Sequence, residues 1–397
     1  MNYELIWILA GFALILSLLT LIWLERPLFR VGTYKPQEEQ DPAFGTPKVS
    51  VIVYSQVSEE KLMDYLTTIC EQDYPDFEVI VVCEATAESN EVLSECCTRR
   101  FNNIYVTFIP PGSHNLSRRK LALTLGMKAA KGKIVVTTTA NAEIHSQRWL
   151  SKLISPFRRE NAESIEVSLG YSHFDYSQMK GWGKWYREFV ALLTDAEWIG
   201  YALARKPYRG DGYNLAFRRK LFFDHKGYSQ SMYLHSGDDD IFINEIATPE
   251  NTAMVLDGES ILSINWGEAS KRMWRAQKEQ YDFTSHWLPQ EPFRRAGAVS
   301  TMQWIILFLY IATGILGYMQ IGNMYDISSY IPAIVSCVLL LLFQLAQILI
   351  YRGAAKKMDA TRLWWALPIF WLLKPLLNKL FDFRHRHTRR WNYTWKR

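Results

Sequence analysis

The feature that most constrains the fold is a run of twenty residues without charge near the N-terminus, residues 5–24. A helix of about 20 apolar residues can cross a bilayer because it satisfies its own backbone hydrogen bonds. No basic segment precedes the run and no small-residue cleavage site follows it, which argues against a secretory signal peptide. We therefore expect a transmembrane anchor over residues 1–30 and a linker over residues 31–47.

Two later apolar runs, 298–318 and 330–351, predict a pair of membrane helices within residues 291–352. Basic residues follow the first run and lie on both outer flanks of this pair, whereas the loop between the two helices has none. The basic residues are Arg26, Arg30, Lys35, Arg294, Arg295, Arg352, Lys356 and Lys357. The positive-inside rule then predicts a multi-pass protein of the inner (cytoplasmic) membrane, with the long middle segment in the cytosol.

The C-terminal segment 353–397 is both apolar and basic. From residue 352 onward the chain has twelve Lys and Arg against two Asp. Prolines and lysines interrupt the apolar stretch 363–383, so we expect an amphipathic helix that lies in the membrane interface. A fourth membrane span is the open alternative for this stretch. A basic tail beside apolar segments indicates membrane lipids, and not nucleic acid, as the partner.

Residues 48–290 have no long apolar run and alternate between strand and helix patterns. We expect strands at 49–55, 77–84 and 134–139, and helices at 59–72 and 118–133. This rhythm predicts an α/β domain with a mostly parallel central sheet and helices on both faces. Ligands of such sheets bind beyond the carboxyl ends of the strands.

Three successive carboxylates, Asp238, Asp239 and Asp240, precede an apolar helix in the stretch SGDDDIF. Like charges this close raise one another's pKa values, which suits a general base. The same residues would also cap the N-terminus of the helix that follows. Both interpretations are open at this point.

Five segments in this order resemble a membrane-anchored family-2 glycosyltransferase with a GT-A fold, over residues 47–287. They are the opening strand-helix-strand unit (PKVSVIVYS to FEVIVVCE), the lysine-containing helix and the strand after it (LSRRKLALTLGMKAAKGKIVVTTTANAE), GDGYNLAFRRKLFFDHKGY, SGDDDIF and QKEQY. The resemblance implies a nucleotide-sugar-binding domain. It also implies inverting transfer from a UDP-linked donor to a glycolipid or polysaccharide acceptor at the cytosolic membrane face.

The resemblance also implies roles for individual residues. Asp239 would be the catalytic base, with Asp238 as its acidic neighbour. The nucleotide-sugar would contact Tyr54, Cys83, Glu84, Lys120, Thr139, Asn141 and Gln277. The acceptor side would include Gly212, Asn214, Asp240 and Trp274.

Two motifs of that family are degenerate here. Thr139 and Asn141 stand where the two aspartates of the DxD motif belong, and Gln280 and Tyr281 replace the Arg and Trp of QxxRW. Neutral oxygens bind Mg²⁺ or Mn²⁺ more weakly than carboxylates do. Glu143 with Asn141 could form a shifted metal site. Alternatively, basic side chains could neutralise the diphosphate, and the candidates are Arg119, Lys120, Lys271, Arg272 and Lys278.

Two functions therefore remain open. The first is an active enzyme of the hexosyltransferase class. The second is a catalytically degenerate protein that binds a nucleotide, a glycan or an active paralogous glycosyltransferase without transferring sugar. A membrane scaffold without a ligand site is the remaining alternative. The persistence of the acidic motif favours the first function, and the loss of the DxD aspartates favours the second.

Overall fold

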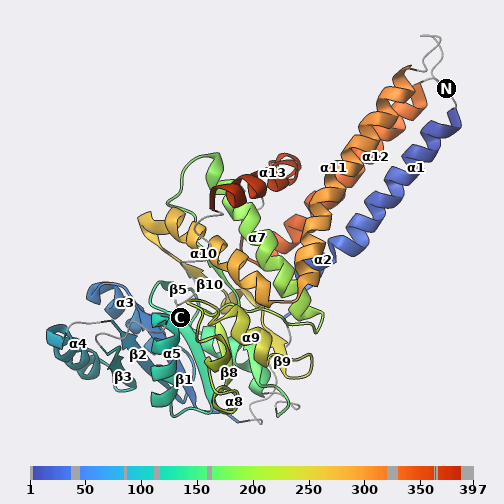
Figure 1. Ribbon diagram of the computed structural model, residues 1–397. Coiled ribbons are helices and arrows are strands. Elements are labelled where there is room, and N and C mark those ends of the chain that lie inside the picture. The colour runs from blue at the N-terminus through green and yellow to red at the C-terminus, as the bar shows by residue number, and fades with distance from the viewer. Residues whose placement is uncertain are drawn as a thin grey trace.

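The computed structural model describes residues 3–36, 45–84, 87–110, 117–158, 163–319, 330–361, 363 and 365–385. A globular α/β part holds the sheets. Three long helices project from it side by side, α1 (Tyr3–Leu19), α11 (Gln290–Met319) and α12 (Ile331–Lys357) (Figure 1). The last described helix, α13 (Leu367–His385), lies beside α7 (Trp182–Leu203) and runs across the direction of the three long helices (Figure 1).

The main sheet has seven strands in the order β3-β2-β1-β4-β8-β6-β9. Only β8 runs antiparallel to its neighbours β4 and β6, and the other pairs are parallel. The strands are β1 (Val49–Ser55), β2 (Phe77–Cys83), β3 (Ile104–Phe108), β4 (Ile134–Thr139), β6 (Val167–Leu169), β8 (Leu215–Arg218) and β9 (Thr252–Met254). The predicted α/β class with a mostly parallel sheet is confirmed.

A smaller sheet, β5-β10-β7, lies beyond the carboxyl end of β4. Its strands are β5 (Ala142–Ile144), β10 (Leu262–Ile264) and β7 (Ser172–Phe174). The helices around the two sheets are α3 (Glu59–Cys70), α4 (Ala87–Arg100), α5 (Arg118–Ala129), α6 (Trp149–Leu153), α7 (Trp182–Leu203), α8 (Arg219–Asp224), α9 (Asp240–Ile246) and α10 (Ser270–Thr284).

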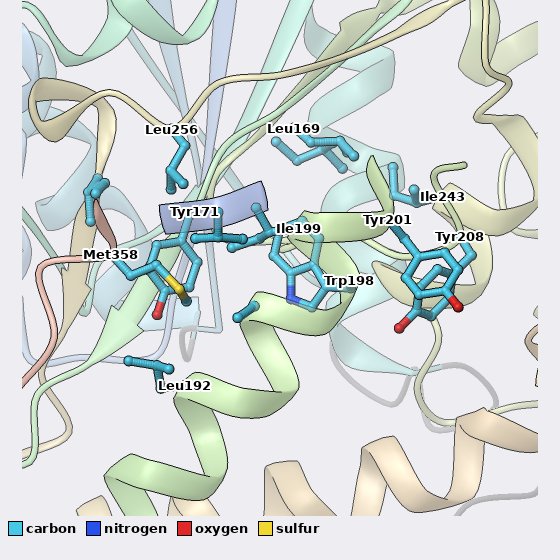
Figure 2. Close-up of a cluster of buried hydrophobic side chains, with 14 of the residues drawn as sticks. Leu169, Tyr171, Leu192, Trp198, Ile199, Tyr201, Tyr208, Ile243, Leu256 and Met358 are labelled. Carbon is cyan, nitrogen blue, oxygen red and sulfur yellow. The ribbon is translucent and has the colours of Figure 1, made fainter. Parts of the chain in front are cut away.

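Alternating side chains of the buried strands face two separate cores, as the period of two in a strand requires. Ile52 and Tyr54 of β1 belong to one core, whereas Val51 and Val53 belong to the other. Helix α7 is buried in the first core. Figure 2 shows its Trp198 and Ile199 near Leu169 of β6, and Met358 reaches the same cluster from the end of α12.

Three of the described helices are long and apolar enough to cross a membrane, Glu4–Leu24, Gln290–Met319 and Ile331–Lys357. The first consists of α1 (Tyr3–Leu19) with a π-helical turn (Thr20–Leu24), and the others are α11 (Gln290–Met319) and α12 (Ile331–Lys357). Helix α13 (Leu367–His385) contains Pro375 and is not among the three. The prediction that it lies in the membrane interface stays a prediction.

The short helix α2 (Arg26–Thr33) joins the first span to the globular part. It passes so close to α7 that a Cβ at Gly200 would lie 2.5 Å from the Cα of Pro27, and a Cβ at Gly32 would lie 3.0 Å from the backbone of Gly353 in α12. Glycine is needed at such contacts because any side chain would separate the helices. The membrane helices and the α/β domain are therefore packed together through α2.

Candidate functional site

The carboxyl ends of β1, β2 and β4 come together at one edge of the main sheet. The strand register pairs Tyr54 with Thr139, and the Thr139 hydroxyl donates to the Tyr54 carbonyl over 3.4 Å. The Tyr54 hydroxyl donates to the Glu84 carboxylate, which also lies 3.5 Å from Arg118. Tyr54, Glu84 and Thr139 are thus brought to one place, and their contact with a nucleotide stays a prediction.

Cys83 does not share this face. Strand alternation turns its side chain to the opposite side from Glu84, into the core that contains Cys97 and Val81. The thiol is buried, and this burial raises its pKa to about 12. The prediction that Cys83 contacts the nucleotide is corrected, since its side chain is part of the core.

The acidic turn at the start of α9 places Asp239 as the N-cap residue. Its Oδ1 accepts the Asp240 backbone N–H at 2.8 Å, and its Oδ2 accepts no hydrogen bond from any residue that the structure describes. Burial raises the pKa of Asp239 to about 6; Asp240 adds to this shift, while Arg119 and Arg209 oppose it. A carboxylate with a free oxygen and a pKa near 6 is ionised at neutral pH and more basic than an ordinary aspartate.

Asp238 and Gly212 form the surroundings of Asp239. The Nε of Arg119 lies 2.7 Å from the Asp238 carboxylate, and the Arg119 guanidinium stacks 4.2 Å from the Tyr213 ring centre. A Cβ at Gly212 would lie 2.7 Å from Arg119 and 2.8 Å from the Cβ of Asp239. Position 212 therefore needs glycine, because a larger residue would collide with the predicted base and with Arg119.

Asp240 has a different use from the one predicted. Its side chain is fully buried, and one carboxylate oxygen accepts the Thr284 hydroxyl of α10 while the other accepts the Ile241 N–H at 2.8 Å. Both oxygens are thus engaged within the protein. Asp240 ties α9 to α10, and its predicted place on the acceptor side is corrected.

Lys120 and Asn214 are also occupied by the fold. The buried Lys120 ammonium donates to the Ser231 carbonyl at 2.6 Å and to the Leu234 carbonyl at 3.2 Å, so it fixes the loop before the acidic turn. The Asn214 amide donates to two backbone carbonyls at 2.7 Å and accepts from the Trp149 indole at 3.1 Å. Neither side chain is free for a ligand, and these two predictions are corrected.

The predicted metal residues do not form a suitable donor set. Asn141 is buried, and its backbone carbonyl accepts the Asn265 N–H. Glu143 is exposed and accepts the Asn265 side-chain amide at 2.8 Å, with Ser263 3.4 Å away. The described residues include no group of three or more His, Cys, Asp or Glu placed to hold a metal ion. Mg²⁺ and Mn²⁺ prefer several carboxylate oxygens, so these neutral donors around one carboxylate do not fit them.

A cavity of about 340 Å³ lies between the α/β domain and the helices at the membrane side. Trp274 and Gln277 of α10 line it, as do residues of α7, α11 and α13. The Gln277 amide donates to the Tyr281 hydroxyl at 2.9 Å. The degenerate QxxRW segment therefore lines a cavity whose other wall belongs to the membrane-side helices.

Arg209, which directly precedes the Gly-Asp-Gly segment, was not predicted as a site residue from the sequence. It lines this cavity, is only 2% exposed, and its guanidinium carbon lies 3.2 Å from the Tyr281 ring centre. Its Nε and Nη2 are buried and have no hydrogen-bond partner among the described residues. Buried N–H donors without partners are costly, and an anionic ligand would satisfy them. Burial could not be inferred for a lone arginine from its neighbours in sequence.

Asp195 of α7 lies in the same cavity. Burial raises its pKa to about 7, and Arg209 opposes this shift. Its oxygens accept from the Trp198 indole at 3.4 Å and from the Tyr171 hydroxyl at 3.5 Å. The cavity therefore combines one guanidinium with unused donors and one aspartate that titrates near neutral pH.

The other basic candidates are dispersed. Lys271 and Arg272 are exposed on α10, and the Lys278 ammonium donates to the Asn378 side chain of α13 at 2.8 Å. Lys278 still lines the cavity, together with Lys374. The positive charge that could meet a diphosphate is thus carried by Arg209, Lys278 and Lys374.

Comparisons with known proteins give one family model and several solved structures that are similar to this chain. Residues 49–221 match the family model described as glycosyl transferase family 2. No curated protein matches the chain in sequence. Among solved structures, one similar protein is the mannosyltransferase PcManGT from Pyrobaculum calidifontis in complex with GDP-Man and Mn²⁺. Its sequence is 17% identical and the TM-score is 0.52, and the match covers 96% of this chain and 99% of the PcManGT chain. TarS 1–349 of S. aureus, in complex with UDP-GlcNAc, is 16% identical, with a TM-score of 0.40 and coverage of 79% and 89%.

Proposed function

We propose that this chain transfers a sugar from a nucleotide-diphospho sugar to an acceptor at the membrane surface, because residues 49–221 match the family model described as glycosyl transferase family 2. The observation that carries this proposal is the position of Asp239. Its free Oδ2 lies in a buried turn beside Gly212, and Arg209 of the membrane-side cavity is close enough to lower its pKa. In this proposal the donor binds at the strand ends, the acceptor binds in the cavity, and Asp239 is the base that takes the acceptor's proton.

The proposed reaction is a single displacement with inversion. The acceptor hydroxyl oxygen attacks the anomeric carbon, the bond from that carbon to the diphosphate oxygen breaks, and the nucleoside diphosphate leaves with the electron pair. Asp239 takes the proton of the acceptor hydroxyl, which its raised pKa favours. Asp238 is held by Arg119 and acts as the charged neighbour of the base.

On the donor side, we place the nucleotide at Tyr54, Glu84 and Thr139, where three parallel strands end. The leaving diphosphate needs positive charge as it departs. Arg209 supplies it in the proposal, because its buried donors are unused and its stacking on Tyr281 fixes the guanidinium plane. It would thereby replace the arginine that position 280 lacks.

On the acceptor side, the cavity favours a glycolipid over a soluble sugar. Phe293, Ala296, Gly297 and Ser300 of α11 form one wall, and α11 is one of the candidate spans. An acceptor with its chain in the bilayer could reach this wall without leaving the membrane. The membrane in question is the inner (cytoplasmic) one, with the α/β domain on its cytosolic side, on the basis of the basic residues that flank the spans.

A second function, a catalytically degenerate partner of an active paralogue, is supported by one observation. The strand end that would carry the DxD motif has neutral side chains, and the described residues include no metal-binding group. In this alternative the chain would bind a nucleotide-sugar or another glycosyltransferase without transferring sugar.

One experiment separates the two functions. Full-length protein in detergent is incubated with radiolabelled UDP- and GDP-linked sugars and a membrane lipid extract, and label in the organic phase is counted. We expect lipid-extractable product, and NMR of the anomeric signal should show inversion. Binding of a nucleotide-sugar without transfer from any donor would favour the degenerate partner. A product with retained configuration would contradict the single displacement.

A further inference from the structure

A second cavity, of about 390 Å³, lies where the first span meets the α/β domain, away from the acidic turn. Residues from the end of the first span, α2, the end of α7 and the start of α11 line it. In Figure 1 these elements meet where the long helices leave the globular part. The cavity shares no lining residue with the cavity around Arg209.

The charge of this second cavity is strongly one-sided. Five cationic side chains line it, against the single carboxylate of Glu291. The cations are Arg26, Arg30, Lys206, Arg294 and Arg295. Burial, together with the charges of Arg26 and Arg295, lowers the pKa of Arg30. Like charges gathered in one hollow repel each other unless an anion lies among them.

The cavity is built by the fold and is not an accident of surface side chains. Arg295 donates to the Trp23 carbonyl and, over 3.1 Å, to the Tyr201 hydroxyl, which in turn lies 3.2 Å from Glu291. Arg30 lies 3.5 Å from the Gly200 carbonyl. These contacts fix two guanidinium groups on different helices. Arg26 and Arg294 are exposed at its rim, and neither forms an ion pair with a described residue.

The position of the cavity identifies the kind of anion. Trp23 lies at the end of the first span with 63% of its surface exposed, and tryptophan prefers the headgroup level of a bilayer. Ala298 of the second span forms another part of the wall. Guanidinium groups recognise phosphate through paired N–H donors. A phosphate held here would therefore have its acyl chains beside the spans.

We propose that this cavity is a binding site for the headgroup of an anionic phospholipid. The bound phosphate would bridge α2 to α11 and so hold the first span, α7 and α11 in register. Helices α7 and α11 also contribute Thr194 and Ser300 to the cavity around Arg209. An occupied lipid site would therefore stabilise the two helices that form the proposed acceptor wall.

The test uses the full-length, detergent-purified protein and measures bound lipid by native mass spectrometry and melting temperature by thermal denaturation. The probes are phosphatidylglycerol, phosphatidylcholine and soluble glycerol 1-phosphate. We expect phosphatidylglycerol to bind and raise the melting temperature. The other two probes should have little effect, because one has no net charge and the other has no acyl chain.

The decisive variant is Arg26→Gln/Arg294→Gln, in which both rim cations are removed while the hydrogen bonds of Arg30 and Arg295 are kept. Phosphatidylglycerol should bind it about 30-fold more weakly, since each basic residue near an anionic lipid contributes about 1 kcal/mol. Arg352→Gln/Lys356→Gln is the matched control, because it removes two exposed cations at the end of α12 outside the cavity. Circular dichroism confirms that each variant is folded.

Three results would overturn the proposal. One is equal binding of phosphatidylcholine, and another is an equal loss of binding in the control variant, which would indicate general surface charge. The third is full stabilisation by glycerol 1-phosphate, which would identify a site for free anions and not for lipid. None of these readouts depends on sugar transfer, so the lipid site and the proposed enzyme can fail separately.

Discussion

The end of β4 and the turn before α9 illustrate two ways of arranging oxygen atoms near a substrate. At the end of β4 the side chains of Thr139 and Asn141 are neutral, and the Thr139 hydroxyl is directed to a backbone carbonyl. In the turn before α9, three carboxylates are buried side by side and opposed by Arg119 and Arg209. The first region has lost the charge that a metal ion needs, whereas the second has kept the charge that a base needs. Catalysis that depends on the second region should therefore tolerate the loss in the first.

The largest effect is expected at Asp239. In Asp239→Asn, kcat should fall about 10³-fold because a positioned base contributes about 10² to 10⁴ in rate. The wild-type rate should fall as the pH is lowered through about 6, where Asp239 becomes protonated. Steady-state kinetics from pH 5 to 8 measure both effects, and Asp224→Asn, on the exposed surface, is the control. Full activity of Asp239→Asn would show that another group is the base.

The same variant should be more stable than the wild type at pH 8. The folded-state pKa of Asp239 is raised from 3.8 to about 6, so folding disfavours its ionised form above pH 6. Removing the charge should add roughly 1 to 3 kcal/mol to the free energy of unfolding at pH 8. This advantage should shrink as the pH falls from 6 to 4, since both states of the wild type then become protonated. Denaturant unfolding of both proteins at pH 8 and at pH 4 measures this difference in the free energy of unfolding and checks its sign.

A smaller effect is expected at Arg209. Arg209→Met should lower kcat/KM about 30-fold, because a charge-assisted hydrogen bond to a phosphate contributes about 2 kcal/mol. Arg209→Lys keeps the charge but not the planar fork, so its loss should be intermediate. Arg275→Met, an exposed arginine on α10 outside this cavity, is the control. Equal losses in Arg209→Met and the control would exclude a specific phosphate contact.

The difference between the two regions can be removed by placing carboxylates at the end of β4. In the wild type, Mn²⁺ should change UDP affinity by less than about threefold, and Glu143→Ala should leave this unchanged. In Thr139→Asp/Asn141→Asp, Mn²⁺ should tighten UDP binding about tenfold, because two carboxylates then face the diphosphate. Calorimetry with and without Mn²⁺ measures both. Strong Mn²⁺ dependence in the wild type that Glu143→Ala abolishes would instead identify a shifted metal site.

The strands and spans were predictable because their signals are local. The runs 49–55 and 134–139 are short and rich in β-branched residues, and β1 and β4 begin and end at those residues. Membrane helices need only length and an absence of charge, so three apolar runs sufficed to predict α1, α11 and α12. The acidic turn was predictable because its three aspartates are consecutive in the sequence.

The use of single polar residues was less predictable because burial and partners come from distant parts of the chain. The ammonium of Lys120 is bound by carbonyls more than a hundred positions away, and Asp240 is bound by Thr284 of another helix. The role of Arg209 was not predictable because its burial and its contact with Tyr281, 72 positions away, arise only in the folded chain. A sequence motif therefore predicts that such residues lie near the site, but it does not predict whether their side chains are free to bind a ligand.

The smallest expected effect distinguishes the neighbours Cys83 and Glu84. Glu84→Gln should raise the KM for the donor about threefold to tenfold, because Glu84 fixes the Tyr54 hydroxyl at the strand ends. Cys83→Ala should change this KM by less than about twofold, since the thiol faces the opposite core. It should instead lower the free energy of unfolding by about 1 kcal/mol through the small cavity it leaves. Because the two residues are adjacent on β2 and its end, opposite results would establish which face of the sheet binds the nucleotide. A KM effect at Cys83 equal to that at Glu84 would mean that the strand end moves as a whole when the donor binds.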